Sequence, residues 1–332
     1  MKSYRWLLFA IAIIIGVSFV TPFINDYIVG RIMYIGIMIS LAVSLNLING
    51  FTGQFSLGHA GFMAIGAYTS AVITTWVSTH GGQIAGGNDP AAFAIALVVG
   101  GVVAALAGLG VGIPSLRLRG DYLAIVTLGF NEIIRVIIQN VDFKIGGVDY
   151  IGGARGFSVL PLTTFTWVFI IAAITIFCVE NLVNSTYGRG FLAVRDDEIA
   201  AEAMGVDTTR FKVRAFVVGA FFAGIGGGLF AHSNYVITPL DFGFFTSIEI
   251  VVIVILGGMG STVGVILAAI VLTTLSELLR SVPEFRMIIY SLLLIVMMIT
   301  RPQGLLGSEV MGRLMRRRGR LRHPELTAPI ES

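Results

Sequence analysis

The chain has little of what disulfide-bonded proteins and hydrolytic enzymes need. Its single cysteine, Cys178, lies in an apolar run, so neither a disulfide framework nor a CxxC site can form. None of its four histidines is at metal-ligand spacing, and no nucleophile–base constellation appears. A phosphate-binding loop of the pattern GxxxxGK[ST] is missing too. We therefore expect no catalytic residue, no metal site and no cofactor-binding site in this chain.

Charge is also scarce. Only 12% of the residues are charged and 56% are hydrophobic, whereas an average soluble domain has about 25% charged residues. A water-soluble fold could not bury this much apolar surface, so lipid must be part of the solvent. The apolar runs are about 17 to 23 residues long, as membrane-crossing helices require, and do not alternate as barrel strands do. The expected fold is an all-α, polytopic transmembrane helical bundle.

The apolar runs give ten candidate spans. They cover residues 6–24, 28–49, 62–79, 92–113, 121–141, 164–184, 213–236, 242–258, 261–279 and 286–300. Lys and Arg gather at 117–119, 189–214 and 313–322, whereas the loops 80–91 and 237–241 contain none. Because positive residues stay inside, both termini and the long loop are predicted to be cytoplasmic, and an even number of spans fits this arrangement.

Two glycine clusters interrupt the hydrophobic pattern. The expected helix breaks are Gly53, Gly58 and Gly61 in the first cluster and Gly257, Gly258 and Gly260 in the second. The second cluster divides 242–279 into either two spans or a re-entrant hairpin. Corresponding breaks in two halves are typical of transporters built from repeats, so we expect an internal repeat. Glycine is common in membrane helices, however, and a single pair of breaks does not exclude that simpler explanation.

Small residues recur at every fourth position in two spans. The two ridges are Gly100, Ala104, Gly108 and Gly112, and Gly219, Ala223, Gly227 and Ala231. Such ridges let helix backbones approach closely in lipid. The partner is either the same chain or a second subunit.

The long loop 188–212 predicts a short helix at the membrane face. Asp196, Asp197 and Glu198 supply an N-cap and first-turn acidity, and Gly205 is a natural stop. Acidic residues disfavour a helix lying on lipid, so we expect it to enter a groove on another protein. The residues expected to contact that protein are Asp197, Glu198, Ile199, Ala200, Ala201, Glu202, Met204 and Gly205.

Two segments resemble a known family. The run from Gly53 to Tyr68, GQFSLGHAGFMAIGAY, resembles the signature of LivM-type permease subunits of ABC importers for branched-chain amino acids. The loop 195–207 resembles the coupling loop of ABC permeases, in which EAA is followed three residues later by Gly. Ala200, Ala201 and Gly205 match this pattern, but Ile199 stands where Glu is usual.

Further similarity lies at 247–261 and 301–305, so the resemblance covers roughly residues 30 to 307. It implies a single permease domain at 1–307 and a basic cytoplasmic tail at 308–332, in a bacterial inner membrane. The tail either contacts lipid headgroups or only anchors the topology, and no nucleic-acid partner is expected.

The implied partners are a second homologous permease, two cytoplasmic ATPases that carry ATP and Mg, and a periplasmic binding protein that delivers a small amino acid. Urea, short amides or other amino acids are alternative substrates. A channel or secondary carrier working alone, or a membrane enzyme, are alternatives of other classes.

Polar residues inside the spans are candidates for a translocation pathway. They are Asn46, Gln54, Ser56, His59, Glu132 and Glu249. Those at the first break either contact substrate or satisfy freed backbone groups. A charge at mid-membrane costs about 3 kcal/mol, so Glu132 should face protein or water. Its spacing from Arg135 favours an internal ion pair.

Overall fold

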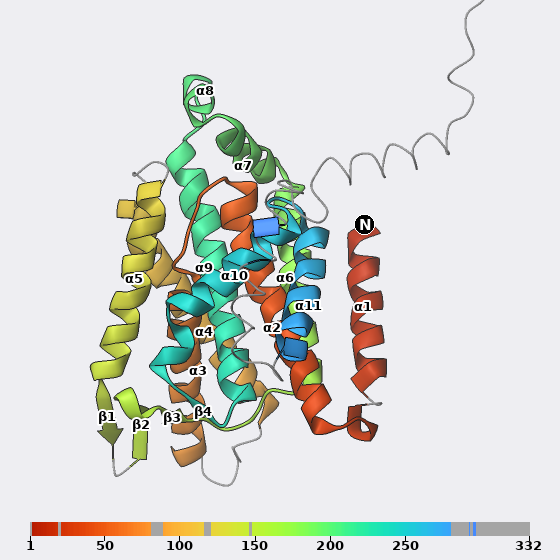
Figure 1. The fold of residues 1–332 in the computed structure, drawn as a ribbon, viewed down its shortest axis with the longest axis vertical. Helices are drawn as coiled ribbons and strands as arrows, with labels where there is room; N and C mark the ends of the chain where they lie inside the picture. Colours follow the sequence, from red (N-terminus) through yellow and green to blue (C-terminus); the bar gives the residue numbers. More distant parts are fainter. Residues whose placement is uncertain are drawn as a thin grey trace, which may run out of the picture.

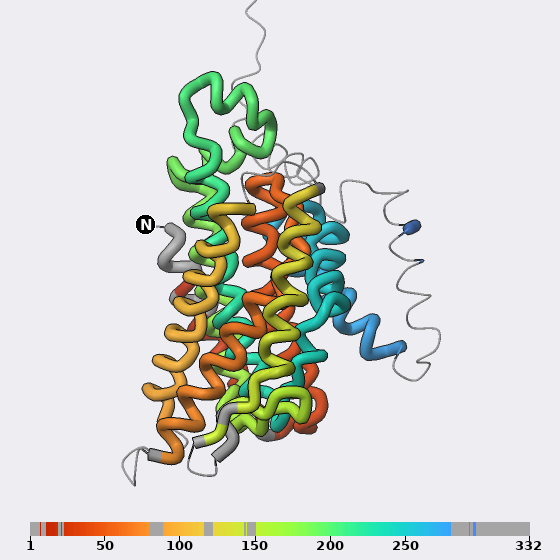
Figure 2. Tube along the Cα trace, turned by 90° about the vertical axis from the view of Figure 1, so that its left-hand side faces the viewer, coloured from red at the N-terminus to blue at the C-terminus, as the bar shows by residue number. Residues whose placement is uncertain are grey.

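The computed structural model describes residues 2–18, 21–80, 89–115, 121–145, 148–279, 292, 295 and 296. The expected span at 286–300 lies largely outside these residues, and the basic tail and Arg117 and Arg119 lie outside them. The described part is a polytopic helical bundle, as predicted (Figures 1 and 2). Within it, seven helices are long and apolar enough to cross a membrane.

Eleven α-helices form the described part of the bundle. They are α1 (Lys2–Ser18), α2 (Asp26–Asn46), α3 (His59–His80), α4 (Pro90–Ser115), α5 (Asp121–Asn140), α6 (Phe165–Val183), α7 (Thr186–Asp196), α8 (Glu198–Ala203), α9 (Thr208–Ser233), α10 (Phe244–Gly257) and α11 (Thr262–Leu278). A π-helical turn, η2 (Leu47–Phe51), extends α2, and a 3-10 turn, η5 (Pro239–Phe242), precedes α10. The shorter 3-10 turns are η1 (Thr21–Phe23) and η4 (Gly153–Arg155).

Four short strands lie at the end of the bundle opposite α8 (Figure 1). β1 (Asp142–Ile145) and β2 (Val148–Gly152) form an antiparallel hairpin after α5. β3 (Phe157–Ser158) pairs with β4 (Val236–Ile237) and so joins the α5–α6 and α9–α10 connections. We did not predict these strands from sequence, because a two-residue pairing across about eighty positions leaves no local pattern.

The small-residue ridges pack within the chain. A Cβ atom on Gly108 of α4 would lie 2.7 Å from the Cβ atom of Ala220 on α9. A Cβ atom on Gly224 would lie 2.6 Å from that of Ala104, and one on Gly66 of α3 would overlap the backbone of Gly224. Helices α3, α4 and α9 therefore meet almost backbone to backbone. In the second predicted ridge a Cβ atom on Gly227 would overlap the Met63 backbone of α3, so both ridges have partners in the same chain.

The second hairpin runs the length of α2. At the α8 end, the Gly260 amide donates to Asn46 Oδ1 at 2.9 Å. At the other end, Glu277 forms an ion pair with Arg31 (Nε–Oε2 3.0 Å) and accepts from the Tyr27 hydroxyl. Helix α11 thus passes α2 from one end to the other.

The close contact of α3 with α9 can be tested by one substitution. Gly66→Val should destabilise the protein by about 2 kcal/mol or more, because the new side chain meets backbone that cannot yield. Gly30→Val on α2 is the matched control, since a Cβ atom there meets nothing within 4 Å. Thermal unfolding in detergent measures both; equal loss from the two variants would contradict the packing described.

Candidate functional site

The first glycine break separates α2 from α3. Gly53 adopts φ +68°, which L side chains rarely adopt, and residues 52–58 have no regular secondary structure. Figure 1 shows this connection descending from the α8 end of α2 before α3 begins. A Cβ atom on Gly58 would overlap the Thr127 carbonyl of α5. Gly61 was expected in the break but lies in the first turn of α3, because its amide already donates to the Gly58 carbonyl (3.1 Å).

Side chains from three elements satisfy the backbone of this break and of the first turn of α3. The Ser56 amide donates to Asn49 Oδ1 (3.2 Å) in η2, and the Leu57 amide donates to Thr127 Oγ1 (3.0 Å) in α5. The Ala60 amide donates to Ser247 Oγ (3.1 Å) in α10. Sequence analysis missed Asn49, Thr127 and Ser247; the only local signal was a polar side chain within an apolar span.

The second break meets the first. Gly258 and Gly260 adopt φ values of +96° and +84° between α10 and α11. The Gly260 amide donates to Asn46, 214 positions away. A Cβ atom on Gly50 would overlap both the Asn46 side chain and the Gly260 amide, so only glycine permits this approach. The structure therefore brings the two predicted breaks together at the α8 end of the bundle.

Arg195, in the last turn of α7, lies between the two breaks. Its Nη1 donates to the Gly50 carbonyl at 3.4 Å, a long hydrogen bond. A Cβ atom on Gly260 would lie 2.9 Å from the same Nη1, and one on Gly53 would lie 3.0 Å from Arg195 Cγ. In the sequence Arg195 is only one of the basic residues of the long loop; its contact with both breaks depends on long-range packing.

A polar cavity of about 470 Å³ opens beside Arg195. Its lining residues are Thr52, Gly53, Gln54, Phe55, Leu123, Val194, Arg195, Asp196, Asp197, Glu198 and Lys212. Gln54 is only 5% exposed, and neither of its amide atoms has a partner among the described residues. Lys212 Nζ lies 2.6 Å from Glu198 Oε1, with the Lys212 side chain 7% exposed. The break and the loop between α7 and α9 thus share one charged cavity.

Helix α8 protrudes from the bundle (Figure 1). Asp197 is its N-cap and accepts from the amides of Ile199 (2.9 Å) and Ala200 (3.0 Å). Gly205 ends it with φ +82°. The loop 188–212 therefore holds the predicted helix, but Asp196 belongs to the preceding helix α7, which begins at a Ser185 cap that sequence analysis did not identify.

One side of α8 is turned away from the chain. Ile199 is 67% exposed and Met204 83% exposed, while Ala201 is buried. Ala200, Glu202 and Gly205 are exposed as well. Glu202 accepts from the Thr208 hydroxyl at 2.8 Å, which joins α8 to the start of α9. An apolar edge in water on a rigid short helix is suited to a protein groove.

The other pathway candidates lie within the bundle. His59 is fully buried, with Nε2 2.9 Å from Ser44 Oγ, and Ser56 Oγ has no partner among the described residues. Glu132 Oε2 lies 2.7 Å from Arg135 Nε, which confirms the predicted pairing within the chain. Glu249 is half-buried on α10, close in sequence to Ser247. Asn46, Gln54, Ser56 and His59 thus surround the break, while Glu132 and Glu249 lie on the two helices that hold it.

Apolar spans and broken helices that meet each other are features typical of membrane transport proteins. The chain belongs to the family described as branched-chain amino acid transport system permease component, whose sequence profile matches residues 26–300.

Individual relatives agree with the family match. The chain is 37% identical over 299 residues to the high-affinity branched-chain amino acid transport system permease protein LivM of Escherichia coli, covering 81% of this chain and 68% of that protein. LivM of Salmonella typhimurium gives the same values. LivH, a second permease protein of the Escherichia coli system, is 24% identical over 283 residues, covering 80% of this chain and 90% of that protein. No solved structure matches the chain significantly.

Arg195 can be tested as the contact between the two breaks. Arg195→Gln removes the Nη1 donor to Gly50, so the amides of 258–261 should exchange with deuterium about fivefold faster, corresponding to about 1 kcal/mol. Arg189→Gln is the control, because Arg189 lies on α7 and donates only to Thr186 at 3.4 Å among the contacts of the described residues. Unchanged exchange in Arg195→Gln would show that the breaks are held without it.

Proposed function

We propose that this chain is the transmembrane permease subunit of an ATP-driven importer for branched-chain amino acids. The family and the LivM relatives support the class and the substrate. The observation that carries the mechanism is the position of Arg195, which links the helix before α8 to both glycine breaks.

In this mechanism, α8 docks in a groove of a cytoplasmic ATPase through Ile199 and Met204. ATP and Mg bind on the two ATPase subunits and not on this chain. Closure of the ATPases moves α8 as a rigid body, and the movement reaches the bundle by two routes. One is the Lys212–Glu198 ion pair at the start of α9, and the other is Arg195 at the breaks. Two packed arrangements of the breaks then give alternating access.

The remaining features of the proposal concern topology and partners. The complete chain crosses the inner membrane ten times as a single permease domain, with both termini and α8 in the cytoplasm and its halves related by an internal repeat. The basic tail interacts with lipid headgroups or anchors the topology. A second homologous permease completes the pathway, and a periplasmic binding protein delivers the amino acid at the β-hairpin end.

Two alternative functions can be distinguished from the proposed one. The same architecture could import urea, short amides or other amino acids, since the candidate pathway residues are uncharged at the break. A channel or secondary carrier working alone is disfavoured, because it leaves the exposed apolar edge of α8 without a role.

The docking of α8 predicts that a charge on its apolar edge will uncouple the importer. Met204→Glu should reduce co-purification of the coexpressed ATPase subunits and leucine uptake by about tenfold or more, since an apolar contact of this kind contributes about 2 kcal/mol. The fold should be unaffected, because Met204 is 83% exposed. Tyr235→Glu, at a position 75% exposed near the opposite end, is the control for ATPase co-purification. Retained ATPase binding in Met204→Glu would exclude this docking mode.

The substrate class is tested by competition. In cells that express the chain with its partner subunits, uptake of labelled leucine should be suppressed by excess isoleucine or valine and unaffected by urea. A variant with Met204→Glu supplies the background rate. Suppression by urea, without suppression by isoleucine, would select the alternative substrate.

A further inference from the structure

The outer face of α5 combines charge with exposed apolar surface in the middle of a membrane span. Glu132 and Arg135 satisfy each other at 2.7 Å, yet their side chains remain 34% and 22% exposed. Arg135 also donates to Gln139 Oε1 at 3.1 Å, so the polar groups form a stripe along one side of the helix. Lipid offers no hydrogen bonds to the remaining donors and acceptors of this stripe.

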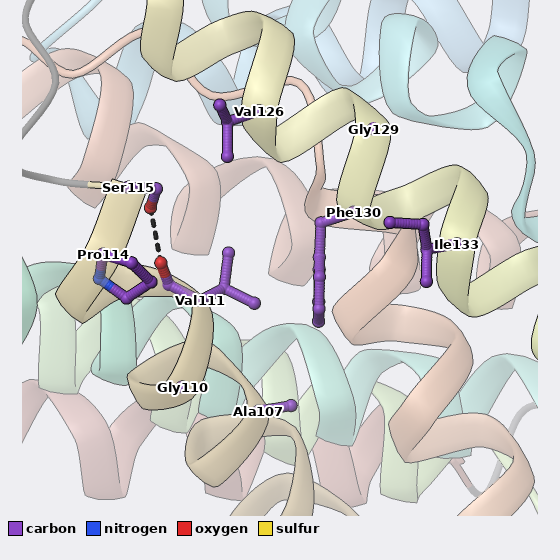
Figure 3. A pocket seen from close by; sticks show the side chains of 9 residues that line it. All are labelled: Ala107, Gly110, Val111, Pro114, Ser115, Val126, Gly129, Phe130 and Ile133. Atoms are coloured by element: carbon purple, nitrogen blue, oxygen red, sulfur yellow. Dashed lines mark hydrogen bonds between the residues drawn. The ribbon is translucent and has the colours of Figure 1, made fainter.

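On the other side of the same face, a groove of about 620 Å³ separates α5 from α4 (Figure 3). Its lining residues are Ala107, Gly110, Val111, Pro114, Ser115, Val126, Gly129, Phe130 and Ile133. In Figure 3 Phe130 extends between the two helices, and Ser115 turns back to the Val111 carbonyl (2.6 Å). A Cβ atom on Gly110 or Gly129 would meet nothing within 4 Å, in contrast to the glycines between α3, α4 and α9.

Beside the groove, α5 carries a ridge of further exposed apolar side chains. Ile125, Val136 and Ile137 are exposed on α5, next to the exposed groove residue Ile133. We call the ridge, the groove and the Glu132–Arg135–Gln139 stripe together the α5 face.

We infer that the α5 face is the surface on which the second, homologous permease subunit packs. The inference rests on the proposed function, which supplies a second permease in the assembly. The partner helix that fits is apolar, places a side chain in the groove beside Gly110 and Gly129, and carries a hydrogen-bonding side chain opposite Glu132 and Arg135.

The polar stripe indicates that this face is covered by protein and not by lipid. A lipid acyl chain can fill an apolar groove but cannot hydrogen-bond a carboxylate and a guanidinium at mid-span. The relatives indicate that the partner is a different, homologous permease chain, since two permease proteins of one Escherichia coli system, LivM and LivH, both match this chain. A dimer of two copies of this chain is the competing arrangement.

Site-specific photo-crosslinking in bacterial membranes tests directly whether the α5 face contacts the second permease. The chain is coexpressed with the second permease, each carrying a different tag, and p-benzoylphenylalanine replaces Ile133 on the α5 face. Replacement of Cys178, an exposed residue of α6, is the control. In Figure 1 α5 lies at the left edge of the bundle, whereas α6 lies right of its centre. The expected product is an adduct that carries both tags at position 133 and not at 178. An adduct of two identical chains, or lipid adducts alone at 133, would overturn the inference.

Filling the groove provides a second measurement. Gly129→Leu should reduce recovery of the second permease with this chain by tenfold or more, whereas Gly30→Leu on α2 should not. Both glycines face open space, so neither change should disturb the fold of the chain itself. Equal recovery from both variants would count against the groove as an interface.

Leucine uptake separates the two proposals. If the wild-type chain transports leucine but the chain with the crosslinker at 133 gives no mixed adduct, the assignment of the α5 face as the interface is wrong and the proposed function stands. If the mixed adduct forms without leucine transport, the interface stands and the substrate assignment fails.

Discussion

Backbone that leaves its helix inside a membrane must find hydrogen bonds in the protein, and the arrangement of this bundle depends on how residues 52–60, the break and the start of α3, find theirs. In hydrocarbon each unpaired amide or carbonyl costs several kcal/mol, on the order of 4 or more. Asn49, Thr127 and Ser247 supply the acceptors. Because these side chains lie on η2, α5 and α10, satisfying one short segment also fixes three membrane-embedded elements around the start of α3.

Two kinds of contact divide the bundle into a stiff and a deformable part. Helices α3, α4 and α9 meet with glycine against backbone, and such packing tolerates little sliding. Around Arg195 the contacts are instead a few hydrogen bonds, two of the glycine turns with positive φ, and a charged cavity. Segments held in this way change arrangement at low cost. Helix α9 belongs to both parts, since Lys212 near its start lines the cavity and its later turns lie in the packed block.

The parts of this structure that sequence could predict are those set by local physics. Hydropathy located the seven described helices that are long and apolar enough to cross a membrane, and Asp197 and Gly205 marked the ends of α8 because caps act on their own helix. The sequence could not predict pairings between distant positions, such as Arg195 with Gly50 or β3 with β4. Gly61 shows the limit at short range: a glycine reads equally well as a break or as the first turn of a helix, and the bond from its amide to Gly58 decides between them.

Helix α5 connects the deformable part of the bundle to its outer surface. Thr127 holds the first break through the Leu57 amide, and Glu132 begins the polar stripe of the outer face little more than one turn further along the same helix. A rigid helix transmits displacement along its length, so movement of the break shifts the α5 face as well. A continuous series of contacts therefore leads from α8 through Arg195 and the break to Thr127 on α5. This series of contacts ends at the α5 face, on which we place the second permease subunit.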